Sequence, residues 1–313
     1  GMLKLTAMVA LSTALGVGLT VNNAKADDNT NVNGGTTEQV VTSYSQSKQA
    51  LNQVTVSSVN AAQQNSTPVR NESNAQQINY PANYNLAQLS NVNQDDPDSV
   101  QRFDQVAKPG LTQNDYQSDP ASAQQSVDIN NLSDQQATEM NHYAIDLINQ
   151  ARAHFNKGPF IQNQGTIDTV KRMAQQYQDK GKTIENESRE QWHDETILNH
   201  DSENISAVQI YADNDPRLQN VVRPFATAKG SDFVDNRYVP LFSVTNMDDL
   251  RAMIYYGVTT MLFNDAGDYY AHAQNFLTRK QPIYSMAVYP SIVPGHLEAH
   301  VSDGTSFQYD INN

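Results

Sequence analysis

The chain has 313 residues, a formal net charge of −14 and no cysteine. The lack of cysteine excludes disulfides and thiolate chemistry. The acidity argues against nucleic acid and anionic membranes as partners, because both are bound mainly through Lys and Arg.

Residues 1–26 have the pattern of a secretory signal peptide. Lys4 precedes an apolar run from Leu5 to Val21, and Ala24-Lys25-Ala26 forms a cleavage motif. The run is short and rich in Ala, Gly and Thr, which favours cleavage over a membrane anchor. Cleavage would remove two lysines and lower the net charge to −14 − 2 = −16. We therefore expect a secreted protein with no membrane segment after cleavage.

Residues 27–128 are rich in Asn, Gln, Ser, Thr and Asp and contain few apolar clusters. Such a composition buries too little surface to offset the entropy of ordering the chain, so we expect a disordered arm. The segment from Ile78 to Tyr84 is an exception that could pack on the domain. The arm is interpreted as a flexible spacer, with an adhesive or wall-spanning role as the alternative.

A folded domain is expected over residues 129–313, beginning with two amphipathic helices. Ser133 and Gln136 form a capping-box pattern before the first helix. An apolar stripe from Ile167 to Tyr177 predicts a second helix, which ends at Gly181. Both helices are typical of core packing.

The middle of the domain combines a polar segment, a strand and a long loop. Residues 182–201 are polar and contain His193 and His200, and the alternating pattern after Glu203 predicts a strand. Residues 211–244 contain several prolines and are expected to form a surface loop, with a lid over a cleft as one interpretation.

The segment from Thr245 to Leu277 predicts a central helix followed by a fixed histidine. Thr245 and Asp248 give a second capping-box pattern, an apolar stripe runs to Leu262, and the turn residues at 264–267 end the helix. His272 follows this turn.

Residues 283–289 and 296–302 predict two strands of a hairpin. The alternation in the second strand puts His296, Glu298 and His300 on one face, which indicates a solvated face or, less strongly, a second metal site.

Several of these pieces together resemble the CAP superfamily of extracellular proteins (cysteine-rich secretory, antigen-5 and pathogenesis-related). The matching pieces are residues 131–134, 146–152, 193–194, 203–205, 261–265 and 272–277. More narrowly, they are similar to the surface-exclusion branch of Gram-positive secreted and surface proteins. The resemblance implies an α+β fold, an α-β-α sandwich with a small antiparallel sheet between helix layers, here preceded by a disordered arm.

The resemblance also implies a central cleft with two histidines and two acids, which in some members binds a divalent metal. His193, Glu203 and His272 match three of these positions and are suitable ligands for a metal such as zinc. His200 is the alternative to His193. It is less favoured because three residues leave little chain to cross a cleft before Glu203. The fourth position, near residues 253–257, holds Tyr255 and Tyr256 instead of an acid, which argues against tight metal binding.

The function expected from these features is a secreted or surface-associated, non-enzymatic binding module for a cell-envelope or surface ligand. The alternatives are a metal-dependent hydrolase that uses the His193, Glu203 and His272 site, and an adhesive arm carried by an inert domain. The sequence shows no Leu-Pro-x-Thr-Gly sorting motif, no hydrophobic tail and no lipobox cysteine. We therefore expect release from the cell or non-covalent association with its wall.

Overall fold

The structure is a computed structural model that describes residues 76–184, 186–188, 191, 193–198, 203–209, 222–234, 241–278, 286–293 and 296–302. The predicted signal peptide, residues 27–75 of the arm and His200 lie outside the described residues. Within the described part, each helix is too short or too polar to cross a membrane.

The two expected helices of the domain are present. Helix α7 (Asp134–His154) begins with the predicted capping box, in which Ser133 and Gln136 satisfy each other's backbone N–H groups. Helix α8 (Gln164–Asp179) is capped by the side chain of Asn163, and Gly181 follows it at φ 62°. Glycine adopts this left-handed backbone without strain, which ends the helix. Both predictions are confirmed.

Three antiparallel strands form a sheet in the order β1-β5-β4, made of β1 (Asn204–Gln209), β4 (Ala287–Val293) and β5 (His296–Ser302). The expected hairpin is present, although residues 283–285 of its predicted first strand lie outside the described residues. Strand β4 also continues beyond the predicted end at 289, so that Pro290 lies inside it, opposite Ala299. Proline is tolerated here because β4 is an edge strand. Two N–H groups on this edge, of Val288 and Ile292, donate to the side chains of Asn141 and Gln178.

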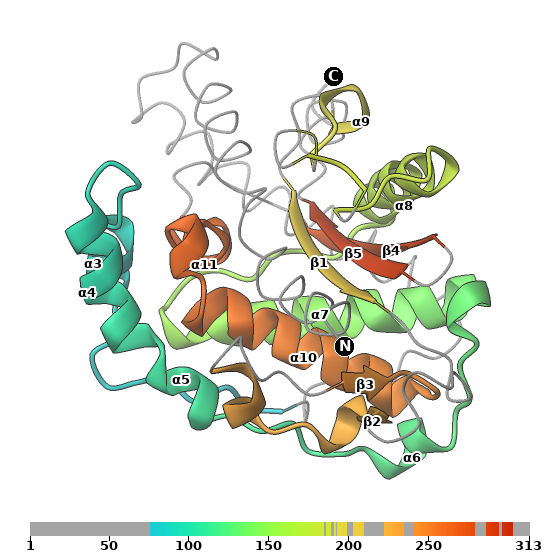
Figure 1. Cartoon of the computed structure of the whole chain (residues 1–313), viewed down its shortest axis with the longest axis horizontal. Coiled ribbons are helices and arrows are strands. Elements are labelled where there is room, and N and C mark those ends of the chain that lie inside the picture. Colours follow the sequence, from blue (N-terminus) through green and yellow to red (C-terminus); the bar gives the residue numbers. More distant parts are fainter. Residues whose placement is uncertain are drawn as a thin grey trace.

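The sheet lies between helix layers. Figure 1 shows α8 on one side of the sheet, and α7 together with the long helix α10 (Met247–Phe263) on the other. The short helix α9 (Glu195–Leu198) packs beside α8. The fold is therefore α+β with α-β-α layers, as the sequence predicted.

Helix α10 is buried on every side rather than along one stripe. Its N-cap is Asn246, whose side chain accepts from the N–H of Asp249, so the predicted cap at Thr245 is wrong by one residue. Asp248 does not close a capping box. Its carboxylate instead accepts hydrogen bonds from residues 116–119, which belong to a different layer.

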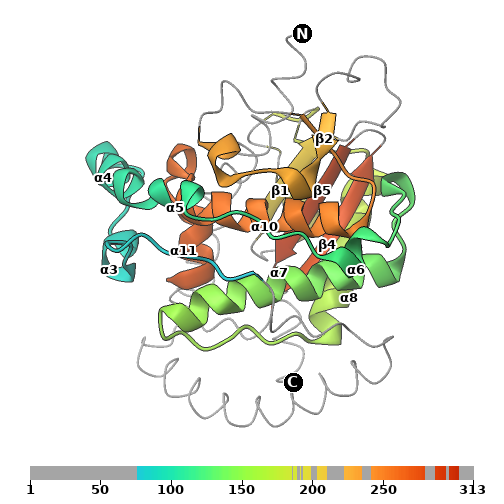
Figure 2. The ribbon, with the colours of Figure 1, turned by 90° about the horizontal axis from the view of Figure 1, so that it is seen from below.

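That further layer, residues 76–128, is here called the N-terminal layer. It contains α3 (Leu86–Ser90), α4 (Pro97–Ala107), α5 (Pro109–Thr112) and α6 (Pro120–Ala123), and it leads through η2 (Ile129–Asn131) into α7. Figure 2 shows α5, α6 and the chain between them along α10, with α3 and α4 near its end and α11. The expected disordered arm is therefore wrong for residues 76–128, and the expected start of the domain at 129 is too late.

The N-terminal layer is ordered because its larger apolar residues, such as Tyr84 and Phe103, are buried against the domain. Phe103 is 0% exposed and packs edge-on against Tyr270 at a centroid distance of 4.8 Å. The buried Tyr84 hydroxyl donates to the carbonyl of Leu262 at 3.0 Å. The packing of Tyr84 confirms the exception made for the segment from Ile78 to Tyr84.

The described part of the loop at 211–244 packs on the outer side of α10. It contains a parallel pair, β2 (Val222–Pro224) with β3 (Leu241–Ser243), and two short helices, η4 (Phe225–Thr227) and η5 (Gly230–Phe233). Phe233 stacks on Tyr256 of α10 at 4.6 Å. Beyond α10, η7 (Ala266–Asp268) leads into α11 (Ala271–Leu277), which carries His272.

Candidate functional site

Glu203, at the entry to β1, is the centre of a buried polar cluster. Its side chain is 0% exposed. One carboxylate oxygen, Oε1, lies 2.6 Å from His193 Nδ1 and accepts from the Tyr177 hydroxyl at 3.0 Å. The other oxygen, Oε2, lies 2.8 Å from His300 Nδ1. The structure thus brings together two of the three predicted site residues, His193 and Glu203.

His193 is placed by the chain that leaves α8. The hydroxyl of Tyr177, on the last turn of α8, accepts from the N–H of Asp194 at 2.9 Å. The Asp194 carboxylate binds Lys182 at 2.8 Å and Lys180 at 3.2 Å. These contacts fix the backbone next to His193, which is itself 6% exposed.

His300 also belongs to this cluster. The sequence did not identify it as a partner of Glu203. It lies in β5, is 0% exposed, and stacks on the Tyr177 ring at 4.5 Å with an interplanar angle of 13°. Its Nε2 lies 2.8 Å from Ser291 Oγ on β4 and 3.9 Å from Glu298 Oε2. The expectation of a solvated strand face is therefore wrong, because α8 covers this face of the sheet. The alternation of polar residues in β5 was the sequence signal for His300. Alternation alone does not show which element packs over a strand face.

The charges in the cluster stabilise one another. Burial alone would raise the pKa of Glu203, but the charge of His300 and the hydrogen bonds from His193 and His300 lower it to about 2. Burial alone would lower the pKa of His300, but the charge and hydrogen bond of Glu203 raise it above its usual value. Both shifts favour an ionised Glu203 paired with a protonated His300.

His272, the third predicted residue, has a different partner. Its Nδ1 lies 2.9 Å from Asp265 Oδ2, which also accepts from the His272 backbone N–H at 3.2 Å. Burial, and then nearby His193, lowers the pKa of His272 well below its usual value. Burial, and then nearby Asp268, raises the pKa of Asp265 well above its usual value. His272 therefore lies within electrostatic range of His193, but it forms its own buried pair with Asp265.

The chain before His272 has an uncommon backbone. Tyr269 and Tyr270 both lie in the left-handed region, at φ 59° and 55°, which is rare for consecutive non-glycine residues. The Tyr270 hydroxyl holds this turn by donating to Asp104 at 2.6 Å and lying 3.0 Å from the Phe263 carbonyl. The N-terminal layer, which contributes Asp104, therefore helps to place His272.

The resemblance implies an acid near residues 253–257 of α10, but none of these residues is an acid. Tyr256 donates to the carbonyl of Ala228 at 2.6 Å and accepts from the N–H of Tyr116 at 2.9 Å, so it faces the outer layers. Met253 and Ile254 instead line an apolar cavity of about 20 Å³ between α10, α7, α11 and the sheet. That volume has room for about one water-sized sphere.

The arrangement of these residues does not fit the metal site that the resemblance implies. Both Glu203 oxygens already accept hydrogen bonds, and the imidazole nitrogens that face Glu203 are donors rather than ligands. His272 turns its Nδ1 to Asp265. Within the described ranges, no three His, Asp or Glu side chains surround a common point as metal ligands would. The roles of His193, Glu203 and His272 as metal ligands remain a prediction, and a metal bound to Glu203 would have to displace one of its hydrogen-bond donors.

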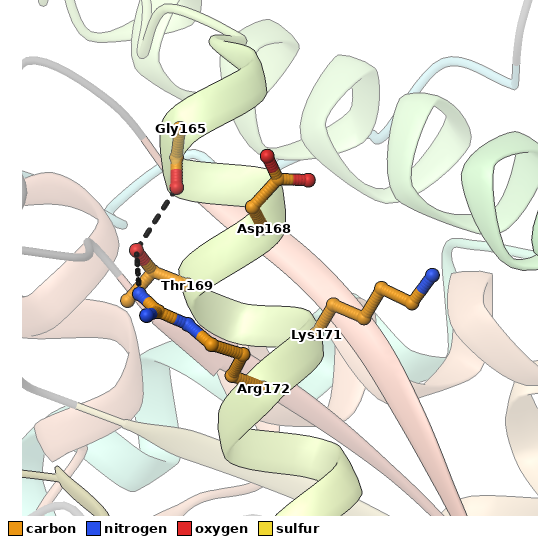
Figure 3. Close-up of a pocket in the computed structure, with 5 residues that line it drawn as sticks. All are labelled: Gly165, Asp168, Thr169, Lys171 and Arg172. Atoms are coloured by element: carbon orange, nitrogen blue, oxygen red, sulfur yellow. Dashed lines mark hydrogen bonds between the residues drawn. The ribbon is translucent and has the colours of Figure 1, made fainter.

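An open hollow of about 430 Å³ lies on α8, lined by Gly165, Asp168, Thr169, Lys171 and Arg172 (Figure 3). Arg172 reaches back along the helix and donates to Thr169 Oγ1 at 3.3 Å, and Thr169 donates to the Gly165 carbonyl at 2.9 Å. Lys171 points to the other side of the helix and pairs with Asp134 at 3.0 Å. The hollow therefore offers both donor and acceptor groups to solvent.

No protein-family model and no curated protein matches this sequence. Among solved structures, the chain is similar to one described as "CAP domain of Enterococcal PrgA", with 16% identity, a TM-score of 0.49, and coverage of 73% of this chain and 85% of that chain. The CAP domain is also what the sequence motifs resemble. The narrower surface-exclusion branch remains a prediction.

Proposed function

We propose that this CAP-like chain is a secreted or surface-associated, non-enzymatic binding module that acts in cell-surface contacts. The observation that carries the proposal is the closed Glu203 cluster. Its acid and both of its histidines are at most 6% exposed and are hydrogen-bonded to one another. Buried side chains that are hydrogen-bonded to one another do not present a ligand position or a reactive group to a substrate.

The hydrolase alternative has one feature in its favour, a hydrogen-bonded chain that joins Ser291, His300 and Glu203 in the order of a nucleophilic triad. Two properties argue against it. Ser291 is only 2% exposed, beneath α8. In addition, the raised pKa of His300 favours the protonated imidazole, which does not accept the serine proton. This chain of residues is better explained as internal support for the sheet.

The hollow on α8 is a candidate contact surface for a ligand. Arg172 and Asp168 are both exposed at its rim, and the third charged residue there, Lys171, is paired with Asp134, so the charges are close to balanced. The whole chain has a net charge of −14, so the surface outside the hollow would repel a strongly anionic polymer. A polar, nearly neutral ligand such as an envelope glycan or peptide suits the hollow better.

Binding of the full chain to purified Gram-positive cell-wall material tests this proposal. We expect saturable binding, and we expect Arg172→Ala to weaken it by about tenfold, the effect of losing roughly 1.4 kcal/mol. Arg102→Ala, on the exposed side of α4, is the matched control and should bind as the unsubstituted chain does. Absence of binding to every envelope fraction would refute the binding role, whereas binding unaffected by Arg172→Ala would place the contact elsewhere.

A deletion of residues 27–75 separates the binding domain from the adhesive-arm alternative. If the domain carries the activity, the shortened chain should bind cell-wall material as well as the full chain. Loss of binding from a shortened chain that still folds would assign the activity to the arm.

A further inference from the structure

Glu203 needs a positive partner, because an ionised carboxylate at 0% exposure is unstable without one. In the site implied by the family resemblance, a divalent metal would fill this role. Here the carboxylate has protein partners on both oxygens, with His193 and Tyr177 on Oε1 and His300 on Oε2. At least three of its roughly four acceptor positions are therefore already used.

The geometry of the histidines also differs from that of metal ligands. Each Nδ1 that lies within 2.8 Å of Glu203 shares a proton with the carboxylate and has no lone pair left for a metal in that direction. The carboxylate thus has the position of a group that orients imidazoles, as outer-shell carboxylates do in metal sites. The other ring nitrogen of His300 lies 2.8 Å from Ser291 Oγ. A zinc ion at about 2.0–2.2 Å from a Glu203 oxygen would have to displace one of these donors.

His272 does not contribute to the same point. Its Nδ1 is held by Asp265, and its Nε2 has no hydrogen-bond partner among the described residues. Both atoms are fully enclosed. The third predicted ligand is thus held by Asp265, and only its enclosed Nε2 is left for a metal.

We propose that His300 takes the place of the metal ion, so that His193, Glu203 and His300 form a metal-independent clamp. The clamp joins parts that are distant in the sequence: the segment after α8, the entry to β1 and the middle of β5. Tyr177 adds α8 to it, through its hydrogen bond to Glu203 and its stacking on His300. The clamp therefore fastens α8 to the sheet without a cofactor.

Thermal unfolding of the full chain with zinc chloride or EDTA, together with metal analysis after dialysis, tests this inference. We expect no retained metal, and no change in Tm with either reagent. A metal bound at this site and present at a hundred times its Kd would instead raise the Tm by about 5–10 °C. Retained zinc at one equivalent, with a rise in Tm that His193→Ala abolishes, would overturn the proposal.

His300→Ala provides the converse test. Removing the imidazole frees Glu203 Oε2, so this variant should unfold at a lower temperature and should gain a zinc-dependent rise in Tm. His154→Ala, an exposed histidine on α7, is the control for zinc binding elsewhere, and it should gain no such rise. A folded His300→Ala that is as stable as the unsubstituted chain would contradict the clamp. If His300→Ala does not fold, the metal measurements on the unsubstituted chain and on His193→Ala still decide the question.

Discussion

His300 determines the character of the Glu203 cluster, because it supplies the positive charge that the buried carboxylate requires. Sequence reasoning identified Glu203 and His193 but read the polar face of the last strand as solvated. An alternating strand shows which residues share a face, but it does not show what covers that face. Here α8 covers it, and Tyr177 of α8 contacts both His300 and Glu203.

The clamp predicts a defined pH dependence of stability. Glu203 has a pKa lowered from 4.5 to about 2, so its contribution is present above pH 4.5 and is lost as the pH falls toward 2. His300 has a pKa raised from 6.5, so its contribution is present below pH 6.5 and is lost as the pH rises through the folded-state pKa. The clamp should therefore contribute most between about pH 4.5 and 6.5.

This dependence is measured as the difference in free energy of unfolding between the unsubstituted chain and His300→Gln across pH. Taking a difference removes the opposing effect of His272, whose lowered pKa destabilises the fold as the pH falls below 6.5. The difference should be largest in the predicted window and should shrink above it. A difference that grows toward alkaline pH would show that His300 is not the charged partner.

Asp248 attaches the N-terminal layer to α10. Its carboxylate accepts from the Tyr116 hydroxyl at 2.7 Å, from the Asp119 N–H at 2.8 Å and from the Ser118 hydroxyl. Asp248→Ala should lower the free energy of unfolding by at least about 1.5–3 kcal/mol, the usual effect of losing a hydrogen bond to a charged group. Urea unfolding measures this loss, with the exposed Asp95→Asn as the control. Equal stability of the two variants would mean that the layer is held by other contacts.

At the scale of elements, α10 is the helix around which the layers are arranged. The sequence predicted its existence and its end, because apolar residues recur along it and turn residues follow. It did not predict burial on all sides, since that depends on two segments that precede α10 in the chain. The N-terminal layer covers one outer side, and the loop with Phe225, Phe233 and Phe242 covers another.

These two segments meet at Gly230. A Cβ atom added there would lie 1.7 Å from the Leu111 carbonyl oxygen and 2.3 Å from that of Asn114, so the two backbones would have to separate. Gly230→Ala should therefore destabilise the fold by at least about 1–3 kcal/mol, the usual range for overpacking. Gly267→Ala is the matched control, because an added Cβ there meets nothing within 4 Å. Similar Tm values for both variants would refute the close approach of η5 to α5.

For the whole molecule, sequence periodicity predicted the elements whose packing face is long and regular. These are α7, α8, α10 and the strands of the sheet. It failed for the N-terminal layer, where the buried apolar residues are spread singly among polar ones and most of the helices are short. The family resemblance, rather than periodicity, predicted two members of the polar cluster, His193 and Glu203. It did not predict the pairing of His300 with Glu203, because that pairing depends on the β1–β5 register.

Limited proteolysis tests the revised extent of the domain. Since Gln76 is hydrogen-bonded to Gln117 and Tyr80 packs on α7 and α10, a resistant core should begin at or before Gln76. Mass spectrometry of the fragments identifies this boundary. A stable, folded core that begins between Gln124 and Ser133 would show that the N-terminal layer is dispensable.

The central claim is that the buried cluster supports the fold, whereas function depends on binding at the surface. Glu203→Gln tests it most directly, because the substitution keeps the side-chain shape and removes the charge. The measurement is binding of the variant to cell-wall material, normalised to the folded fraction from circular dichroism. We predict a lower Tm and unchanged binding per folded molecule. A folded variant that no longer binds, or a cell-wall hydrolysis activity that the substitution abolishes, would contradict the claim.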